Sequence, residues 1–535
     1  MKKYFSENIL LIIILLLGAV LRVVAAPSSP PALNIDEAAL GYNAYSIFKT
    51  GADEHGRFLP LSLESFGDWK LPVYSYVAVL PVAALGLSEF STRFPSMVAG
   101  IVGILLVYLL SIALFQKKPL ALFAALFFAV SPWSIYFSRA AYEVNLATTL
   151  FLAGLLLLIY STDRKSVTYR TVFAGLFFGL TLFTYHSYII FTPLFLFAYC
   201  IYYGKKLGKK LAYILIPFGV LLIISGYSNL NAGSNKFSNT TILANQDVIY
   251  NRVEHFRKDT INNPILFDKI HTKYAGIPYQ VLQNYIVSFS PTFLFDRGGE
   301  KLVHNLDGFG NLYIFDVLLL IVGFAGIFYF REKKVVVLGI WLILSPIPSA
   351  LTLDAPNSTR LFMLMPLFTL ISAYGAWVLW NFSKKGISQR LLFVVLSLLF
   401  IVNCLYFFNL YFVHFNKRAQ FWRYGYKEIV QISNQHKNDS IIVRGPYDFP
   451  YIYFLFYNSY DPKKFIEEVE YYPTNHEGFK YVKSFGRYRF VEDLSKETEN
   501  SSTIYFDTQN FHEGDTIITL PNGDPIFKYY VGKDN

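Results

Sequence analysis

The sequence predicts a polytopic α-helical membrane protein with about eleven spans, interfacial helices and a small C-terminal α/β domain. Of its 535 residues, 54% are hydrophobic and 18% aromatic, whereas only 16% are charged. A soluble globular protein carries about 25% charged residues. Several apolar stretches also approach the roughly 20 residues that a helix needs to cross a bilayer. The predicted spans cover residues 8–26, 94–115, 119–137, 142–160, 171–185, 187–203, 210–227, 311–330, 335–351, 361–380 and 391–411.

The segments that flank these spans alternate in charge, which predicts the orientation of the chain. One set reads MKK, FQKKP, STDRKSVTYR, YGKKLGKK, REKK and NFSKKGISQR. Such basic segments face the cytoplasm by the positive-inside rule, so the other loops face outward. Because every second connection is basic, the count of eleven spans is internally consistent. The net charge of +10 thus follows from membrane topology, and no nucleic-acid partner is expected.

Three features of the apolar segments need separate treatment. The N-terminus, with MKK, an apolar core and VVAAPS, also resembles a cleavable secretory signal, but its apolar run is long for one, so we favour an uncleaved span. The stretch 72–87 is short and contains Pro81, so we expect it to lie in the outer interface. Cys200 and Cys404 both fall within predicted spans, so neither a disulfide framework nor a thiolate metal site is expected.

The chain divides into a membrane domain over residues 1–415 and a tail over 416–535, predicted to be an extracytoplasmic α/β domain. The membrane domain has a first outer loop at 27–93, a large one at 226–310 and a short one, LDAPNSTR. In the tail, FWRYGYKEIVQISNQH reads as a helix, whereas SIIVRG, STIYFDT and DTIITLPNGDPIFKYYV read as strands. The last contains Asn522-Gly523, a strong hairpin-turn signal.

Ionisable residues are nearly absent from the middle of the predicted spans. Arg22, Glu143, His186 and Asp316 all lie near outer ends. A proton-coupled transporter or an ion channel places such groups near the midplane of the membrane. The polar chemistry of this chain is therefore expected at its outer face.

Adjacent carboxylates, Asp36 and Glu37, follow the first span. Asn34 precedes them at the spacing of a helix cap, with Glu37 completing a capping box, so the pair has a purely structural interpretation. The same loop also supplies Lys70 and further charged residues. Arg139 and Glu143 are four residues apart and so share a helix face, as an interfacial ion pair or as part of a site.

The motifs of the outer segments resemble those of a known superfamily. In order they are DE after the first span, TGADEHG, GDWKLPVYSY, STRFPS and SPWSIYFSRAAYE. This order is similar to that of the GT-C superfamily of polyprenyl-phosphate-sugar-dependent glycosyltransferases. Within it, the chain most resembles the bacterial members of the protein O-mannosyltransferase and aminoarabinose-transferase branch. The resemblance covers roughly residues 1–415.

The resemblance implies an inverting integral-membrane glycosyltransferase. The donor would be a sugar on dolichyl or undecaprenyl phosphate, and the acceptor a hydroxyl of a protein, lipid or glycan at the outer face of the cytoplasmic membrane. No cofactor is expected, and a divalent cation is compatible but not required. The resemblance implies catalytic carboxylates at Asp36, Glu37 and Glu143, and donor-phosphate contacts at Lys70, Arg139 and Arg360; the outer histidines and one tyrosine are candidates for substrate contact, namely His55, Tyr74, His186 and His304.

One spatial expectation and one alternative complete these predictions. We expect Asp36, Lys70 and Arg139 to meet in one water-reaching hollow beside membrane lipid. The alternative is a membrane protein that binds or translocates a glycan or lipid without catalysis. The scarcity of polar groups at mid-depth argues against translocation.

Overall fold

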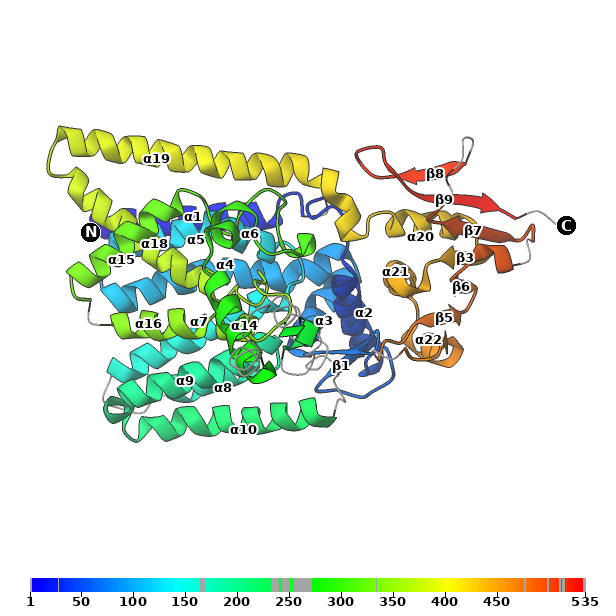
Figure 1. Ribbon diagram of the computed structural model, residues 1–535, viewed down its shortest axis with the longest axis horizontal. Helices are drawn as coiled ribbons and strands as arrows, with labels where there is room; N and C mark the ends of the chain where they lie inside the picture. Colours follow the sequence, from blue (N-terminus) through cyan, green and yellow to red (C-terminus); the bar gives the residue numbers. More distant parts are fainter. Residues whose placement is uncertain are drawn as a thin grey trace, which may run out of the picture.

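The computed structural model describes most of the chain. It covers residues 2–26, 28–163, 169–231, 240–242, 250–251, 253–254, 272–332, 334–475, 478–497, 500–509, 511 and 515–532, with side chains except at 2–7, 231, 273–274 and 416–418. The middle of the predicted large outer loop therefore falls mostly outside the described residues. The described chain forms a long helical bundle with a sheet domain at one end (Figure 1).

The bundle confirms the predicted helical membrane fold. Six described helices are long and apolar enough to cross a membrane, or up to seven if the bent pair α5 and α6 counts as one span. Each of the eleven predicted spans contains a helix, and the exact number of spans stays a prediction. The bundle helices are α1 (Lys2–Val23), α4 (Glu89–Phe115), α5 (Lys118–Val130), α6 (Pro132–Ser138), α7 (Glu143–Asp163), α8 (Tyr169–Thr181), α9 (His186–Leu207), α10 (Lys210–Asn231), α14 (Lys273–Val287), α15 (Asp316–Tyr329), α16 (Val335–Leu344), α17 (Ile347–Ala350), α18 (Leu364–Ser383) and α19 (Ile387–Phe408).

Prolines divide two of the predicted spans into shorter helices. The predicted span 119–137 bends by 54° between α5 and α6. Ser131 precedes Pro132 and has a ψ of 130°, since a residue before proline avoids the helical region, and its side chain caps α6. The predicted span 335–351 likewise divides into α16 and α17, with Pro346 at the break.

Ion pairs gather four of the basic segments at one end of the bundle. Lys117 pairs with Glu332, and Asp163 pairs with both Lys334, at 2.7 Å, and Lys206, at 3.2 Å. In Figure 1 the N-terminus lies at this end, and the tail lies at the opposite end. The position of these basic segments at one end of the bundle agrees with the alternation of basic and non-basic loops along the sequence. Which end faces the cytoplasm stays a prediction from the charge rule.

A compact layer at the other end of the bundle is built from the first outer loop. It contains α2 (Ile35–Thr50), the antiparallel strands β1 (Leu63–Ser65) and β2 (Asp68–Lys70), and α3 (Val73–Leu85). The stretch predicted to lie in the interface is α3, a 13-residue helix with Pro81 inside it. It packs on α2 and on the start of α7 through a small apolar cluster of Leu40, Ala44, Tyr74, Ala78, Val82 and Ala141.

The tail is an α/β domain, as the sequence predicts, and its sheet is mixed and seven-stranded. The strand order is β4-β5-β6-β3-β7-β9-β8, and central β3 is parallel to both β6 and β7. The predicted helix and strands are confirmed as α20 (Tyr426–Gln435), β3 (Ser440–Arg444), β7 (Thr503–Asp507), β8 (Thr516–Thr519) and β9 (Pro525–Val531). Elements that were not predicted are α21 (Tyr451–Tyr457), α22 (Pro462–Glu468), β4 (Glu470–Tyr471), β5 (Val482–Phe485) and β6 (Tyr488–Val491).

The tail shares its hydrophobic core with the first outer loop. Ala38 and Tyr42 of α2 belong to the same buried cluster as Ile452 and Phe456 of α21. The phenols of Tyr42 and Tyr45 donate to backbone carbonyls of the tail, each at 3.1 Å. α2 is therefore held between the bundle and the tail (Figure 1).

Candidate active site

The paired carboxylates lie at the first turn of α2, where they have different tasks. The Asn34 side chain accepts from the Asp36 backbone N–H at 3.0 Å, and the Glu37 side chain accepts from the Asn34 N–H at 3.0 Å. The capping box read from the sequence is therefore formed by Asn34 and Glu37. The carboxylate of Asp36 takes no part in it, and its side chain is 57% exposed.

Lys70 reaches Asp36 from the end of the β1–β2 hairpin. Its ammonium donates to Asp36 Oδ1 and also lies 5.6 Å from the centre of the Phe66 ring. The Lys70 side chain is only 6% exposed, so the protein covers its stem and presents its charged end to Asp36. The hairpin thus sets an ion pair at the aqueous edge of the outer layer.

Neighbouring acids keep Lys70 charged despite its burial. Burial is the largest single influence on its pKa and acts to lower it. The carboxylates of Asp36, Glu143 and Asp68 outweigh that effect and raise the pKa above its usual value. Glu143, the first residue of α7, is therefore within electrostatic range of the Asp36–Lys70 pair.

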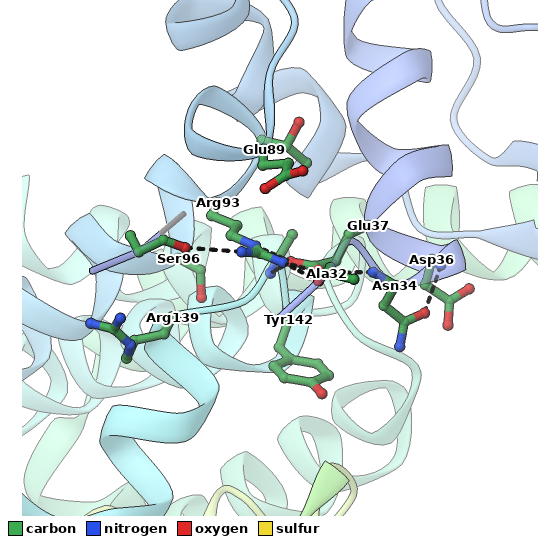
Figure 2. A network of polar contacts seen from close by, with 12 residues as sticks. Ala32, Asn34, Asp36, Glu37, Glu89, Arg93, Ser96, Arg139 and Tyr142 are labelled. Atoms are coloured by element: carbon green, nitrogen blue, oxygen red, sulfur yellow. Dashed lines mark hydrogen bonds and ion pairs between the residues drawn. The ribbon is translucent and has the colours of Figure 1, made fainter. Parts of the chain in front are cut away.

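Glu37 is buried in a network of its own with Arg93 (Figure 2). Arg93 Nε donates to Glu37 Oε1 at 2.9 Å, and Arg93 Nη2 donates to Oε2 at 3.0 Å. Glu37 Oε1 also accepts from the Ala141 N–H at 2.7 Å, and Arg93 reaches the carbonyls of Ala26 and Ala32. Both oxygens of Glu37 are thus engaged in joining α2, α4 and the turn before α7.

Arg139 lies apart from the Asp36–Lys70 pair, and in Figure 2 it stands at the far end of the network from Asp36. Its guanidinium donates to the carbonyls of Leu21, Val24 and Ser29 at 2.8–3.1 Å. The ring of Phe412 covers it at 4.9 Å. This arrangement fastens the end of α1 to α6 and uses the donors that a phosphate would need. The three-residue hollow expected from the sequence is therefore assembled from two residues only.

A second group of charges comes from the loop before α18. Asp354 pairs with Arg360 and, at 3.2 Å, with Lys301. Burial acts to raise the pKa of Asp354, but the two cations outweigh it and lower the pKa to about 2. Two cations share one carboxylate, so this group carries a net positive charge.

His304 and Tyr185 connect the two charged groups. The charges that act on His304 include Asp36 from the first group and Lys301 and Arg360 from the second. Tyr185 is within electrostatic range of Glu143 and of Arg360. Burial, aided by Lys301, lowers the pKa of His304 to about 4, so its imidazole is neutral at pH 7. His304 therefore lies within electrostatic range of both charged groups.

The other residues predicted to contact substrate lie in different surroundings. His186 Nε2 is 3.3 Å from the Trp69 carbonyl, directly beside Lys70. Tyr74 is fully buried, and its phenol donates to the Thr92 carbonyl at 2.9 Å. His55 stacks on Tyr471 with 6.3 Å between ring centres, at the contact between the first outer loop and the tail. Of these three, only His186 lies beside the Asp36–Lys70 pair in the contacts found.

Sequence reasoning missed how three site residues are used. Arg93, Lys301 and Asp354 were not singled out from the sequence. The signal for Asp354 was present: LDAPNSTR is a short, turn-rich loop in which Asp354 and Arg360 can face each other. The partner of Glu37 gave no such signal, because Arg93 is 56 residues away in the chain.

Among the described residues, no group of three or more His, Cys, Asp or Glu side chains is arranged to hold a metal ion. Within the described site, Asp36 and Asp354 are each paired with a cation. A divalent cation would have to displace these partners.

A family model describing dolichyl-phosphate-mannose-protein mannosyltransferases matches residues 70–227. A search of curated proteins finds no match to this chain. The matched segment begins at Lys70, includes Arg93, Arg139 and Glu143, and ends within α10.

Solved structures are similar to this chain. The archaeal oligosaccharyltransferase AglB from Archaeoglobus fulgidus, solved with an inhibitory peptide and a dolichol-phosphate, matches with a TM-score of 0.51 and 15% identity, over 85% of this chain and 64% of AglB. ArnT from Cupriavidus metallidurans matches in the apo state with a TM-score of 0.48 and 10% identity, over 85% of both chains. Its form bound to undecaprenyl phosphate gives 0.47 and 12%, over 85% of this chain and 84% of ArnT.

These comparisons confirm the resemblance to GT-C glycosyltransferases that the motifs indicated. Together with the long apolar helices, they define a multi-pass membrane protein of that fold.

Proposed function

We propose that this protein is a glycosyltransferase that moves a sugar from a polyprenyl-phosphate donor to an acceptor hydroxyl at the outer face of the membrane. The observation that carries the proposal is the Asp36–Lys70 pair, which places an exposed carboxylate and a charged ammonium at one edge of the site. The family model and the fold shared with AglB support the same class of reaction.

The charged groups suit the two ends of such a transfer. Asp36 would accept the proton of the acceptor hydroxyl as its oxygen attacks the anomeric carbon of the sugar. The bond from that carbon to the phosphate oxygen breaks, and polyprenyl phosphate leaves with the electron pair. Direct displacement inverts the anomeric carbon. Lys70 and the pair Lys301 and Arg360 would stabilise the negative charge that develops on the phosphate.

In the free protein, the Asp36–Lys70 ion pair holds both side chains near the positions that the reaction would need. The Lys70 ammonium donates a hydrogen bond to the Asp36 carboxylate. When a donor phosphate enters, Lys70 can transfer its hydrogen bond to the phosphate, which leaves the Asp36 carboxylate to the acceptor. Glu143 lies within range to balance the charge of Lys70 during that exchange.

The test is sugar transfer by the purified protein in lipid nanodiscs, with a set of polyprenyl-phosphate sugars as donors. Asp36→Asn is expected to lower turnover by about 10²- to 10⁴-fold, the usual contribution of a general base. Asp163→Asn is the matched control, because Asp163 is also a partly exposed aspartate paired with lysines, at the opposite end of the bundle.

Unchanged turnover in Asp36→Asn, with normal folding, would remove Asp36 from the reaction and make Glu143 the next candidate. Absence of transfer from every lipid-linked donor would instead favour a protein that binds glycans or lipids without catalysis.

A further inference from the structure

A cavity of about 290 Å³ lies where the tail meets the outer end of the bundle, separate from the charged site. Its walls come from the segment before α2, the first residue of α4, and the helices α20 and α21. Figure 1 shows α20 beside the end of α19, with α21 below it. Binding pockets for small molecules begin at about 300 Å³, so the cavity is close to that size.

The basic side chains that line the cavity are already paired with carboxylates. Lys427 Nζ is 3.1 Å from Glu89, and Arg423 Nη1 is 2.7 Å from Asp448. The Glu89 carboxylate also accepts from the Tyr457 phenol at 2.8 Å. An anionic ligand would have to break these ion pairs, at a cost that a neutral ligand avoids. Glu428, the fourth charged residue of the lining, leaves the lining without net charge, and its carboxylate can accept hydrogen bonds from hydroxyls.

Aromatic rings supply much of the remaining wall. Tyr424, Tyr426, Tyr453 and Tyr457 all line the cavity. Tyr426 and Tyr453 stack with 4.6 Å between ring centres and an interplanar angle of 6°. Tyrosine combines a flat apolar face with a polar hydroxyl. A lining of aromatic rings and hydrogen-bonding groups that has no net charge suits a ligand with C–H faces and many hydroxyls.

From this chemistry we propose that the cavity binds a neutral sugar ring. A sugar packs its C–H face on aromatic rings and exchanges hydrogen bonds with amides, phenols and paired charges through its hydroxyls. The exposed side chain of Gln431 on α20, at the cavity wall, offers an amide of this kind.

The cavity adjoins the buried Glu37–Arg93 network, which lies between it and Asp36. Ala32, which lines the cavity, accepts from Arg93 Nη2 at 2.6 Å, and Arg93 also holds Glu37 beside Asp36. The sugar is therefore placed one layer behind the first turn of α2. Resting on the proposed function, this position makes the bound ring part of a glycan acceptor, so the acceptor class is a saccharide.

The test measures the direct binding of neutral methyl glycosides of glucose, mannose and galactose by saturation-transfer NMR. The protein is held in lipid nanodiscs, because these avoid sugar-based detergents. Gln431→Trp places a large ring in the cavity from an exposed helix position. Gln435→Trp is the matched control, because Gln435 is an exposed glutamine of the same helix that does not line the cavity.

We expect at least one glycoside to bind, with affinity reduced at least tenfold in Gln431→Trp and unchanged in Gln435→Trp and in Asp36→Asn. Inorganic phosphate should not compete, and binding of undecaprenyl phosphate should be the same in both Trp variants. Absence of binding by all three glycosides, equal binding in both Trp variants, or competition by phosphate would overturn the inference. A tenfold loss of undecaprenyl phosphate binding in Gln431→Trp would also overturn it, by assigning the cavity to the donor.

This inference and the proposed function fail in different ways. Glycoside binding by a protein that transfers no sugar would leave the cavity a saccharide site and contradict the enzyme. Transfer without glycoside binding would contradict the cavity assignment alone.

Discussion

Asp36 and Glu37 are neighbours in sequence with opposite environments. The Asp36 side chain is 57% exposed and pairs with Lys70, whereas that of Glu37 is 3% exposed and is held by Arg93. Successive residues of a helix point about 100° apart, so one carboxylate faces the water and the other faces the bundle. A carboxylate is thus the proposed base at position 36, whereas at position 37 it holds neighbouring helices together.

The Arg93–Glu37 and Lys70–Asp36 pairs differ in how readily they can exchange partners. Arg93 donates to Glu37 through two nitrogens and to two carbonyls, a fixed geometry that a planar guanidinium favours. Lys70 offers Asp36 a compact charge that can turn to another partner. The buried pair that joins helices therefore contains arginine, and the exposed pair that would change partners during the reaction contains lysine.

The largest expected effect comes from breaking the buried pair. Arg93→Leu removes the guanidinium that pairs with the buried Glu37, and breaking a buried ion pair typically costs about 3–5 kcal/mol. We expect a large loss of folded protein, measured as yield and as thermal unfolding in nanodiscs. Glu37→Gln keeps acceptors and donors at the same place and should be milder. Normal stability of Arg93→Leu would contradict the structural role of the Glu37–Arg93 pair.

The next effect is on chemistry rather than on folding. Lys70→Met keeps the buried stem but removes the charge, and we expect turnover to fall by about 10²- to 10³-fold, as when one electrostatic contact to a developing charge is lost. Lys206→Met, which breaks an exposed pair with Asp163, is the control. Equal activity of the two variants would show that the Lys70 ammonium does not act on the leaving phosphate.

A smaller effect should appear as a pH dependence of stability. Glu54, 1% exposed in the first outer loop, has its pKa raised to about 8, chiefly by burial. The folded protein therefore binds more protons than the unfolded chain between about pH 4.5 and 8. Stability from this group is present at low pH and is lost as the pH rises through 8.

Glu54→Gln stays neutral at every pH, so it should unfold at a temperature close to that of the wild type at pH 5 and several degrees above it at pH 9. Parallel unfolding temperatures of the two proteins across this range would show that Glu54 does not titrate as its burial requires.

The smallest effect concerns the contact between the tail and the first outer loop. Lys480 of the tail reaches Glu64 at 2.5 Å, but the lysine is 39% exposed and Arg57 also pairs with Glu64. Glu64 is only 3% exposed, but Arg57 still pairs with it in Lys480→Ala, so we expect a cost of about 1 kcal/mol. Its unfolding temperature and its rate of limited proteolysis should stay near wild type. A released tail would show that this ion pair, rather than the shared core, holds the tail in place.

The sequence predicted the membrane helices well because each is specified by its own apolar length. The break at Ser131 was missed because a length rule ignores where a proline divides a stretch. α21 was missed because YIYFLFY is a short apolar run, which periodicity alone assigns equally to a buried strand or a buried helix.

The candidate site was predictable only where the chain supplies local signals. Asp36, with its cap and its motif, was singled out from the sequence. The separation of Asp36 from Glu37 was not, since it depends on Arg93 and Ala141, which approach from distant helices. The motif of Arg139 likewise gives no hint that its guanidinium donates to the carbonyls of Leu21, Val24 and Ser29, at and after the end of α1.

The most direct test of this division of labour measures turnover and unfolding temperature for Asp36→Asn and Glu37→Gln in the same preparation. We expect Asp36→Asn to lose turnover while unfolding near the wild-type temperature, and Glu37→Gln to unfold earlier while its folded fraction keeps substantial turnover. The reverse pattern, with a stable but inactive Glu37→Gln and an active Asp36→Asn, would contradict the assignment of the chemistry to Asp36.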